Sequence, residues 1–199
     1  MSTPGLLFLR RFLRDPVRVA SVAPSSRYLA RAVACGVELR SGDAVIELGP
    51  GTGALTAALH GAIAANPGVR YLGIERDAVL VNHLQQGFPD LCFVAGDAGR
   101  LADIAKDAAI TRARLLVCGV PMILFDPRER VALMDACVNQ LADDGAFRAI
   151  SYIHCWPSRG ARDMRALLRS RFRHSRVSAI VWRNIPPALV LEASSPLRA

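Results

Sequence analysis

From Asp43 onward, short apolar runs alternate with segments whose apolar residues recur at the spacing of a helix. The apolar runs predict strands near residues 43–48, 70–75, 91–95, 113–118, 146–153, 177–183 and 188–193. Helical patterns fill the intervals between them. Because strands that alternate with helices are typical of α/β folds, the sequence predicts a mostly parallel sheet of seven strands with helices on both faces.

The clearest helical pattern runs from Pro127 to about Ala142. Asp126 is a suitable N-cap, and Pro127 occupies the first helical position. The predicted apolar stripe of this helix consists of Val131, Met134, Val138 and Leu141. A further helix is predicted after Ser158, with a stripe formed by Ala161, Met164, Leu168 and Phe172.

The first 40 residues precede the first predicted strand and read as a helical extension, with breaks near Pro16 and Pro24. On a helix over residues 6–14, Arg10, Arg11 and Arg14 share one face, and large apolar side chains such as Phe12 cover the other. A helix of this kind suits the interface of an anionic membrane. We therefore expect residues 1–40 to form a membrane-binding or lid segment, and residues 41–199 to form the main domain.

The composition of the chain indicates which class of partner and which cellular compartment to expect. The chain has 199 residues, 52% of them hydrophobic, which suits one domain of ordinary size. Its net charge of +8 favours an anionic partner, either nucleic acid or an acidic membrane surface. The five cysteines form no CxxC pair, so reduced thiols in the cytoplasm are expected. No apolar run is long and unbroken enough to predict a transmembrane helix.

A glycine-rich turn follows the first predicted strand, in the sequence Glu47-Leu48-Gly49-Pro50-Gly51-Thr52-Gly53. Glycines allow the backbone to approach a ligand closely, and the helix that follows offers free N–H groups. The spacing also satisfies a loose dinucleotide-binding pattern. However, a carboxylate at Glu47 would repel a pyrophosphate and would attract the ammonium of a methionine moiety. The loop therefore favours S-adenosylmethionine over NAD.

Two further acids follow the next two predicted strands. Glu75 ends the second strand and can accept both hydroxyls of a ribose; Asp97, with Ala98 after it, follows the third and can accept from an adenine amino group. Open α/β sheets bind ligands at this edge. The combined pattern resembles motifs I to III of the class I methyltransferases. That resemblance implies a Rossmann-like fold, with S-adenosylmethionine as methyl donor and S-adenosylhomocysteine as product.

A narrower resemblance extends over roughly residues 6–192. The chain resembles the bacterial phospholipid N-methyltransferases in its cofactor motifs, in residues 12–16 and 23–30, and in Asn184-Ile185-Pro186-Pro187-Ala188. It departs from that family at Cys118-Gly119-Val120-Pro121, where Ser-Gly-Leu-Pro is usual, and at residues 149–151, before Tyr152. The resemblance implies methylation of the amine of a phospholipid such as phosphatidylethanolamine, by a cytoplasmic protein peripherally associated with the inner membrane.

The acceptor side is expected around the residues where this family binds its amine. In class I enzymes that methylate amines, a polar residue and a proline lie beside the transferred methyl group, which corresponds to Cys118, Gly119 and Pro121. Tyr152, Asn184 and His154 are candidate partners for the amine or its proton. By resemblance, Ser25 and Ser26 border the methionine end of the cofactor, and they also suit a helix start. No metal site is expected, because the four histidines are scattered.

Three alternatives remain open from the sequence. An RNA adenine dimethylase has a similar cofactor loop, but it usually carries Asn-Leu-Pro-Tyr after the fourth strand, and here Met122 follows Pro121. The acceptor could instead be a small molecule or another amino-lipid. The chain could also bind the cofactor without turnover, although an inactive copy would have no need to keep Glu47, Glu75 and Asp97.

Overall fold

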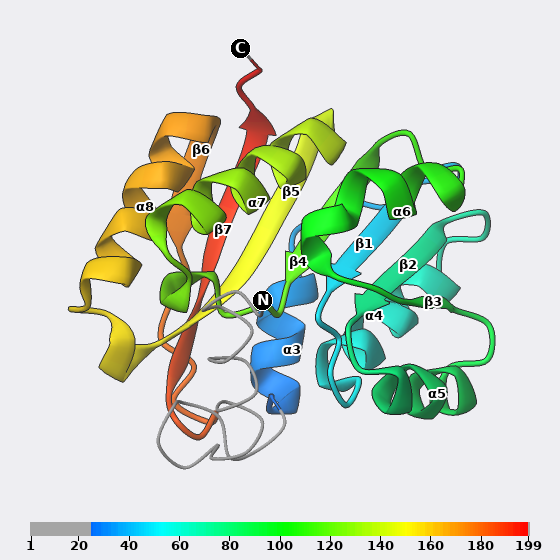
Figure 1. The fold of residues 1–199 in the computed structure, drawn as a ribbon. Helices are drawn as coiled ribbons and strands as arrows, with labels where there is room; N and C mark the ends of the chain where they lie inside the picture. Colours follow the sequence, from blue (N-terminus) through cyan, green and yellow to red (C-terminus); the bar gives the residue numbers. More distant parts are fainter. Residues whose placement is uncertain (1–24, 199) are drawn as a thin grey trace.

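The computed structural model describes residues 25–198, which form one seven-stranded sheet in the order β3-β2-β1-β4-β5-β7-β6 (Figure 1). The strands are β1 Ala44–Leu48, β2 Arg70–Glu75, β3 Cys92–Ala95, β4 Ala113–Cys118, β5 Leu141–Tyr152, β6 Phe172–Val177 and β7 Ala188–Pro196. Strands β1 to β5 pair in parallel, and β7 runs antiparallel to both of its neighbours. The predicted mostly parallel, Rossmann-like sheet is confirmed.

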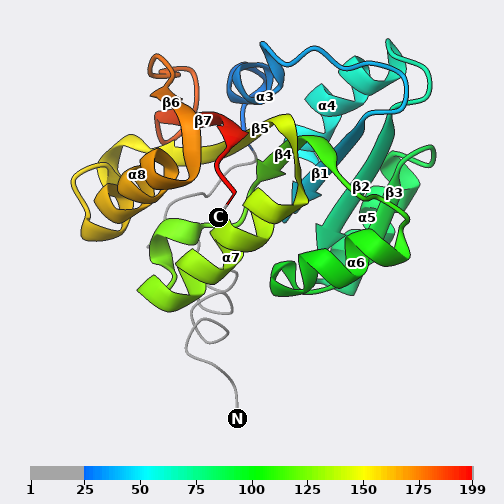
Figure 2. The same cartoon turned by 90° about the horizontal axis from the view of Figure 1, so that it is seen from above.

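Helices cover both faces of this sheet. They are α3 Arg27–Ala34, α4 Ala54–Ala64, α5 Ala78–Gly87, α6 Leu101–Asp107, α7 Pro127–Gln140 and α8 Arg159–Arg171, with 3-10 turns at Ala98–Arg100, Met122–Leu124 and Ile153–Cys155. Figure 2 shows α3 and α4 on one side of the sheet and α6 and α7 on the other. Each side has its own apolar core, built around Leu29 and Leu59 on the first and around Met134 and Phe147 on the second.

The last two strands differ from the sequence prediction. A strand was expected over 177–183, but β6 lies at Phe172–Val177, and only Phe172 in it is buried. The other residues of β6 are exposed and largely polar, because β6 is an edge strand of the sheet. The apolar pattern that predicts strands is therefore missing from it.

The two predicted helices after the fourth strand are present. Asp126 caps α7 by accepting from the backbone N–H groups of Arg128 and Glu129. The helix ends at Gln140, and β5 begins directly at Leu141 rather than near residue 146. Val131 was placed on the buried stripe but is 38% exposed. The buried apolar face consists instead of Leu133, Met134, Cys137 and Val138.

The helix predicted after Pro24 is α3, and Ser26 caps it by accepting from the backbone N–H of Leu29. The interpretation of residues 6–14 as a membrane helix, including Arg10, Arg11, Phe12 and Arg14, falls outside the described residues. The same holds for most of the predicted extension over residues 1–40. Within residues 25–198, no helix is both long and apolar enough to cross a bilayer.

Candidate functional site

Glu47 is the most deeply buried charged residue at the carboxyl edge of the sheet. It lies one residue before the end of β1 and has no exposed surface. Its Oε2 accepts hydrogen bonds from the Tyr71 hydroxyl at 2.6 Å and the Thr56 hydroxyl at 2.9 Å. Its Oε1 has no hydrogen-bond partner within residues 25–198. A buried carboxylate oxygen without a donor is costly, so this atom is well placed to receive a donor from a ligand.

The protonation of Glu47 is set by its surroundings. Burial raises the pKa of the Glu47 carboxyl to about 7, and the hydrogen bonds from Tyr71 and Thr56 oppose that rise. Burial and the adjacent Glu47 raise the pKa of the Tyr71 phenol, so Tyr71 keeps its proton and donates. A cationic ligand at Oε1 would favour the ionised carboxylate. The buried acceptor Oε1 of Glu47, unpartnered among the described residues, therefore fits an ammonium group, which donates hydrogen bonds and carries a positive charge.

The glycine loop brings the ends of β1 and β4 into close contact. A side chain at Gly119 would lie 2.6 Å from the Gly49 carbonyl oxygen and 3.2 Å from that of Leu48. Gly49 itself has a φ of 68° and faces Val120. Gly51 has a φ of 60° and open space beside it, whereas a side chain at Gly53 would meet Leu84 and Phe88. Gly49 and Gly51 therefore shape the loop surface, and Gly53 lets α4 pack against α5.

Glu75, at the end of β2, holds the glycine loop in place. Its Oε2 accepts from the backbone N–H of Gly51 at 3.0 Å, and its Oε1 accepts from those of Arg76 and Asp77. The Gly51 N–H is therefore used by the protein itself. A carboxylate has about four acceptor positions, so Glu75 has room for one more donor, as a ribose hydroxyl would provide.

Asp97 lies two residues beyond the end of β3 and is exposed. Its Oδ1 accepts from the backbone N–H of Gly99. Asp97 thereby caps the 3-10 turn that begins at Ala98. The structure therefore places Glu47, Glu75 and Asp97 at or just beyond the carboxyl ends of three neighbouring strands, as expected. Asp97 differs from the other two acids because it faces solvent.

Cys118 and Pro121 line the next strand end along the sheet. The Cys118 thiol is buried and donates to the Val120 carbonyl at 3.5 Å. Burial raises the pKa of this thiol to about 12, so it stays protonated at neutral pH and cannot act as a thiolate nucleophile. Gly119 is exposed and Pro121 half-buried. Gly119 is therefore the exposed residue of this segment, although its backbone N–H already donates to the Leu48 carbonyl.

Tyr152 ends β5 on the same edge and is half-buried. Its ring stacks on that of His154, with centroids 5.9 Å apart and planes 20° apart. His154 follows the end of the strand, in the turn Ile153–Cys155, and is exposed. The two side chains are neighbours, so an imidazole that is accessible to solvent lies beside Tyr152.

Asn184 ties the C-terminal motif to the start of α3. Its side chain is buried, its Oδ1 accepts from the backbone N–H of Ser26 at 2.8 Å, and its Nδ2 donates to the Pro186 carbonyl at 2.7 Å. The backbone N–H of Ile153 in turn donates to the Pro187 carbonyl at 2.9 Å. Ser25 and Ser26, both half-buried, are therefore fixed next to the segment that contains Tyr152.

Two residues of this site, Thr56 and Tyr71, were not singled out from the sequence. Tyr71 lies on the same face of β2 as Gly73 and Glu75, so the alternation along the strand could have identified it. Thr56 is in the first turn of α4, and its role depends on how that helix packs over β1.

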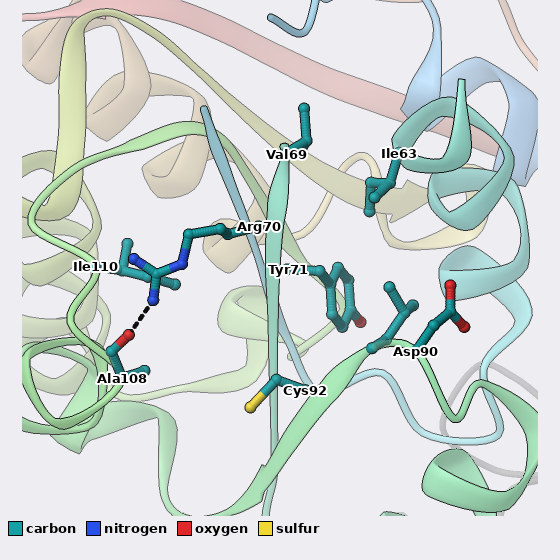
Figure 3. Close-up of a pocket in the computed structure, with 9 residues that line it drawn as sticks. Ile63, Val69, Arg70, Tyr71, Asp90, Cys92, Ala108 and Ile110 are labelled. Atoms are coloured by element: carbon teal, nitrogen blue, oxygen red, sulfur yellow. Dashed lines mark hydrogen bonds between the residues drawn. The ribbon is translucent and has the colours of Figure 1, made fainter. Parts of the chain in front are cut away.

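A hollow of about 450 Å³ lies at the opposite end of β2 and β3 (Figure 3). Arg70, Asp90 and Cys92 line it, and the Arg70 guanidinium donates to the carbonyls of Ala108 and Ala109. Tyr71 belongs to both places, because it lines the hollow while its hydroxyl reaches Glu47. This hollow contains none of the predicted site residues, so the candidate site remains at the carboxyl edge.

The fold is shared with structurally characterised methyltransferases. An S-adenosylmethionine-dependent O-methyltransferase from Thermotoga maritima superposes with a TM-score of 0.68 over 94% of this chain and 72% of that protein, at 15% sequence identity. No protein-family model matches the chain.

Sequence similarity to proteins of known activity narrows the family. The chain is 36% identical to the ribosomal RNA small subunit methyltransferase A of Synechococcus elongatus, but over only 52% of this chain and 37% of that protein. It is 30% identical over 148 residues to the ornithine lipid N-methyltransferase of Singulisphaera acidiphila, covering 73% of this chain and 76% of that relative. The chain therefore belongs to the class I S-adenosylmethionine-dependent methyltransferases, in the family that includes this ornithine lipid N-methyltransferase.

Proposed function

We propose that this protein methylates the primary amine of an amino-lipid at the membrane surface, with phosphatidylethanolamine and ornithine lipid as the two acceptors to test. The observation that carries this proposal is the similarity to a lipid N-methyltransferase over three quarters of that relative's length. The arrangement of the carboxyl edge supports it, because the residues that suit the methyl donor lie next to those that suit an amine.

The donor half of the proposed site is formed by β1, β2 and β3. Oε1 of Glu47, which has no hydrogen-bond partner within residues 25–198, would accept from the methionine ammonium, and Glu75 would accept from the ribose hydroxyls. Asp97 and Ala98 would contact the adenine. Ser25 and Ser26 would close the methionine end, and Asn184 holds the backbone of Ser26 there. When bound, S-adenosylmethionine supplies a methyl group that its sulfonium has already activated.

The acceptor half is formed by the ends of β4 and β5. In this proposal, the Gly119 carbonyl and the Tyr152 hydroxyl hold the amine, and Cys118 and Pro121 form the wall beside it. The amine nitrogen must be neutral to attack the methyl carbon, so its proton passes to His154 or to water. The new N–C bond at the amine would form as the C–S bond of the methyl donor breaks, with S-adenosylhomocysteine as the product. The chain thus contributes alignment and deprotonation, which are sufficient with an activated donor.

We further propose that the protein works in the cytoplasm, peripherally bound to the inner membrane. The N-terminal cations and the excess of arginine over acidic residues favour contact with anionic lipid. RNA is a weaker candidate for the acceptor. The residue after Pro121 is Met122, which is only 2% exposed, so no aromatic side chain follows this proline to stack on a flipped base.

The test is incubation of the purified protein with methyl-labelled S-adenosylmethionine and vesicles that contain phosphatidylethanolamine or ornithine lipid, followed by separation of the lipids. Label in one of these lipids is the expected result, and its distribution over mono-, di- and trimethylated species gives the number of transfers. Label in neither lipid, in a protein that binds the cofactor, would refute the proposed acceptor class.

Glu47→Gln should lower the affinity for S-adenosylmethionine by roughly tenfold to a hundredfold, because it removes a charged hydrogen bond to the ammonium. Isothermal titration calorimetry measures this change. Glu38→Gln, at an exposed acid of the connection before β1, is the matched control and should bind as the wild type does. Equal affinities in both variants would remove Glu47 from the donor site.

A further inference from the structure

Two large apolar side chains protrude from the connection between β6 and β7. Trp182 is 69% exposed and Ile185 is 80% exposed, on either side of the buried Asn184. Isolated exposed apolar residues are common, but a tryptophan and an isoleucine only three positions apart on one connection are unusual on a water-facing surface. Tryptophan in particular favours the boundary between water and acyl chains.

Arg183, on the same connection, meets Arg27 of α3 at the side chain of Tyr28. The guanidinium of Arg183 donates to the Tyr28 hydroxyl at 2.8 Å, and that of Arg27 donates to the same hydroxyl at 3.0 Å. Both guanidiniums also lie over the Tyr28 ring, at 4.9 and 5.0 Å from its centroid. The hydrogen bonds from Arg27 and Arg183 lower the pKa of Tyr28, which reflects the local excess of positive charge.

No acidic side chain among residues 25–198 forms an ion pair with these arginines or with Arg31 of the same helix. Among the ion pairs within residues 25–198, none includes Arg27, Arg31 or Arg183. By contrast, Arg130, Arg171 and Arg176 each pair with a carboxylate. Guanidinium groups held side by side without a counter-ion match the phosphates of lipid head groups in charge and geometry.

The two segments are held together as one unit. Asn184 accepts from the backbone N–H of Ser26 across 158 positions of sequence, so the start of α3 and the β6–β7 connection are joined. We call Arg27, Tyr28, Trp182, Arg183 and Ile185 the docking corner. In Figure 1, α3 begins and the β6–β7 connection turns at the lower edge, where β5 also ends. The docking corner therefore lies on the same edge as Tyr152, which pairs with Ala188 at the start of β7.

We propose that the docking corner binds the surface of an anionic phospholipid bilayer, with Trp182 and Ile185 inserted at the interface and Arg27 and Arg183 on lipid phosphates. The biological purpose of this contact rests on the proposed function, because it would present a lipid amine to the edge that holds Tyr152. The contact itself is independent of turnover. It involves residues other than the N-terminal cations.

The first experiment measures binding of the full-length chain to vesicles of phosphatidylcholine with and without phosphatidylglycerol. Trp182 and Trp156 are the only tryptophans of the chain, so intrinsic fluorescence reports on few sites. We expect a blue shift with the anionic vesicles and quenching by lipids with brominated acyl chains. Trp182→Phe should remove that quenching, and Arg27→Gln and Arg183→Gln should each weaken binding about fivefold.

The matched controls are Val131→Ser, at an exposed apolar residue of α7, and Arg112→Glu, at an exposed cation before β4 on the opposite edge. Both should bind vesicles as the wild type does. Thermal unfolding verifies that every variant is folded. The proposal is overturned if brominated lipid leaves Trp182 unquenched, or if Trp182→Ser with Ile185→Ser binds vesicles normally. It is also overturned if the arginine variants lose affinity for RNA but not for vesicles.

A second assay separates docking from catalysis by supplying dispersed short-chain phosphatidylethanolamine or ornithine lipid. We expect Trp182→Ser with Ile185→Ser to methylate one of these dispersed lipids at the wild-type rate while losing activity on vesicles. If no amino-lipid is methylated in either form but Trp182 is still quenched, the proposed function fails and the docking corner stands. An equal loss of activity on dispersed and vesicle lipid would assign these residues to the acceptor site and refute their docking role.

Discussion

At the scale of single residues, the Glu47 carboxylate is controlled by neighbours that do not themselves have to touch a ligand. Tyr71 and Thr56 donate to the same oxygen, Oε2, which leaves Oε1 without a hydrogen-bond partner among residues 25–198. The pKa of about 7 means that Glu47 is only partly ionised at neutral pH before a cation arrives. Binding of the cofactor should therefore depend on pH through this group.

Tyr71→Phe tests this positioning role. Loss of the phenol removes a hydrogen bond that favours the ionised form, so the pKa of Glu47 should rise further. We expect S-adenosylmethionine to bind several times more weakly than to the wild type at pH 7. The difference in affinity between the variant and the wild type should become smaller towards pH 9, where the Glu47 carboxylate is ionised in both proteins. Calorimetry at several pH values measures this, and a gap that does not change with pH would contradict the role.

The sequence was sufficient to locate Glu47, Glu75 and Asp97, because each follows an apolar run and the ends of parallel strands meet at one edge. It was not sufficient to predict their partners. The Gly51 N–H is occupied by Glu75, and the Asn184 amide is occupied by Ser26 and Pro186. Such contacts join segments that are distant in the chain, and no local pattern encodes them.

At the scale of elements, the contact between β1 and β4 depends on a glycine. The backbone N–H of Gly119 donates to the Leu48 carbonyl at 2.8 Å, which draws the segment after β4 against the glycine loop. A Cβ at this position would collide with the backbone oxygens of Gly49 and Leu48. Backbone atoms cannot move aside as a flexible side chain can.

Gly119→Ala should therefore destabilise the protein by about 1–3 kcal/mol, the usual cost of overpacking. Gly61→Ala is the matched control, since Gly61 lies inside α4 with open space where the Cβ would go. That control should increase stability by roughly 0.5–1 kcal/mol, because alanine is the better helix former. Urea unfolding measures both changes. Equal changes in the free energy of unfolding for the two substitutions would show that the close contact of β1 with the segment after β4 does not contribute to stability.

The sequence pattern located buried strands more accurately than exposed ones. Strand β1 is buried along its whole length, and its apolar run predicted it within one residue. The exposed edge strand β6 was placed five residues too late, because the apolar residues near 177–183 lie mostly in the connection to β7. A pattern of hydrophobic positions reports contact with a core, and in the edge strand β6 only Phe172 has such contact.

At the scale of the whole molecule, the buried Glu47 should make stability depend on pH. The pKa of Glu47 rises from 4.5 to about 7 on folding, so between these values the folded chain holds a proton that the unfolded chain has released. The free energy of unfolding should therefore fall as pH increases from about 4.5 to about 7, by roughly 3 kcal/mol from this group, and level off above.

The measurement is urea unfolding at a series of pH values for the wild type and for Glu47→Gln. Other groups titrate in both proteins, so the difference between the two curves isolates Glu47. As pH rises towards neutrality, we expect the free energy of unfolding of the variant to increase relative to that of the wild type. A constant difference across this range would show that Glu47 is already ionised in the folded, ligand-free protein.

Strand β7 runs antiparallel to both of its neighbours, which affects how the two halves of the proposed site can change independently. Because β7 starts where β5 ends, the connection before it returns to the edge that carries the site. Apart from Ser25 and Ser26, the residues assigned to the methyl donor lie between positions 47 and 98, whereas those assigned to the acceptor all follow position 117. Changes after position 117 would therefore alter the acceptor side and leave residues 47–98 in place, and the contact of Asn184 with Ser26 joins the two halves of the proposed site.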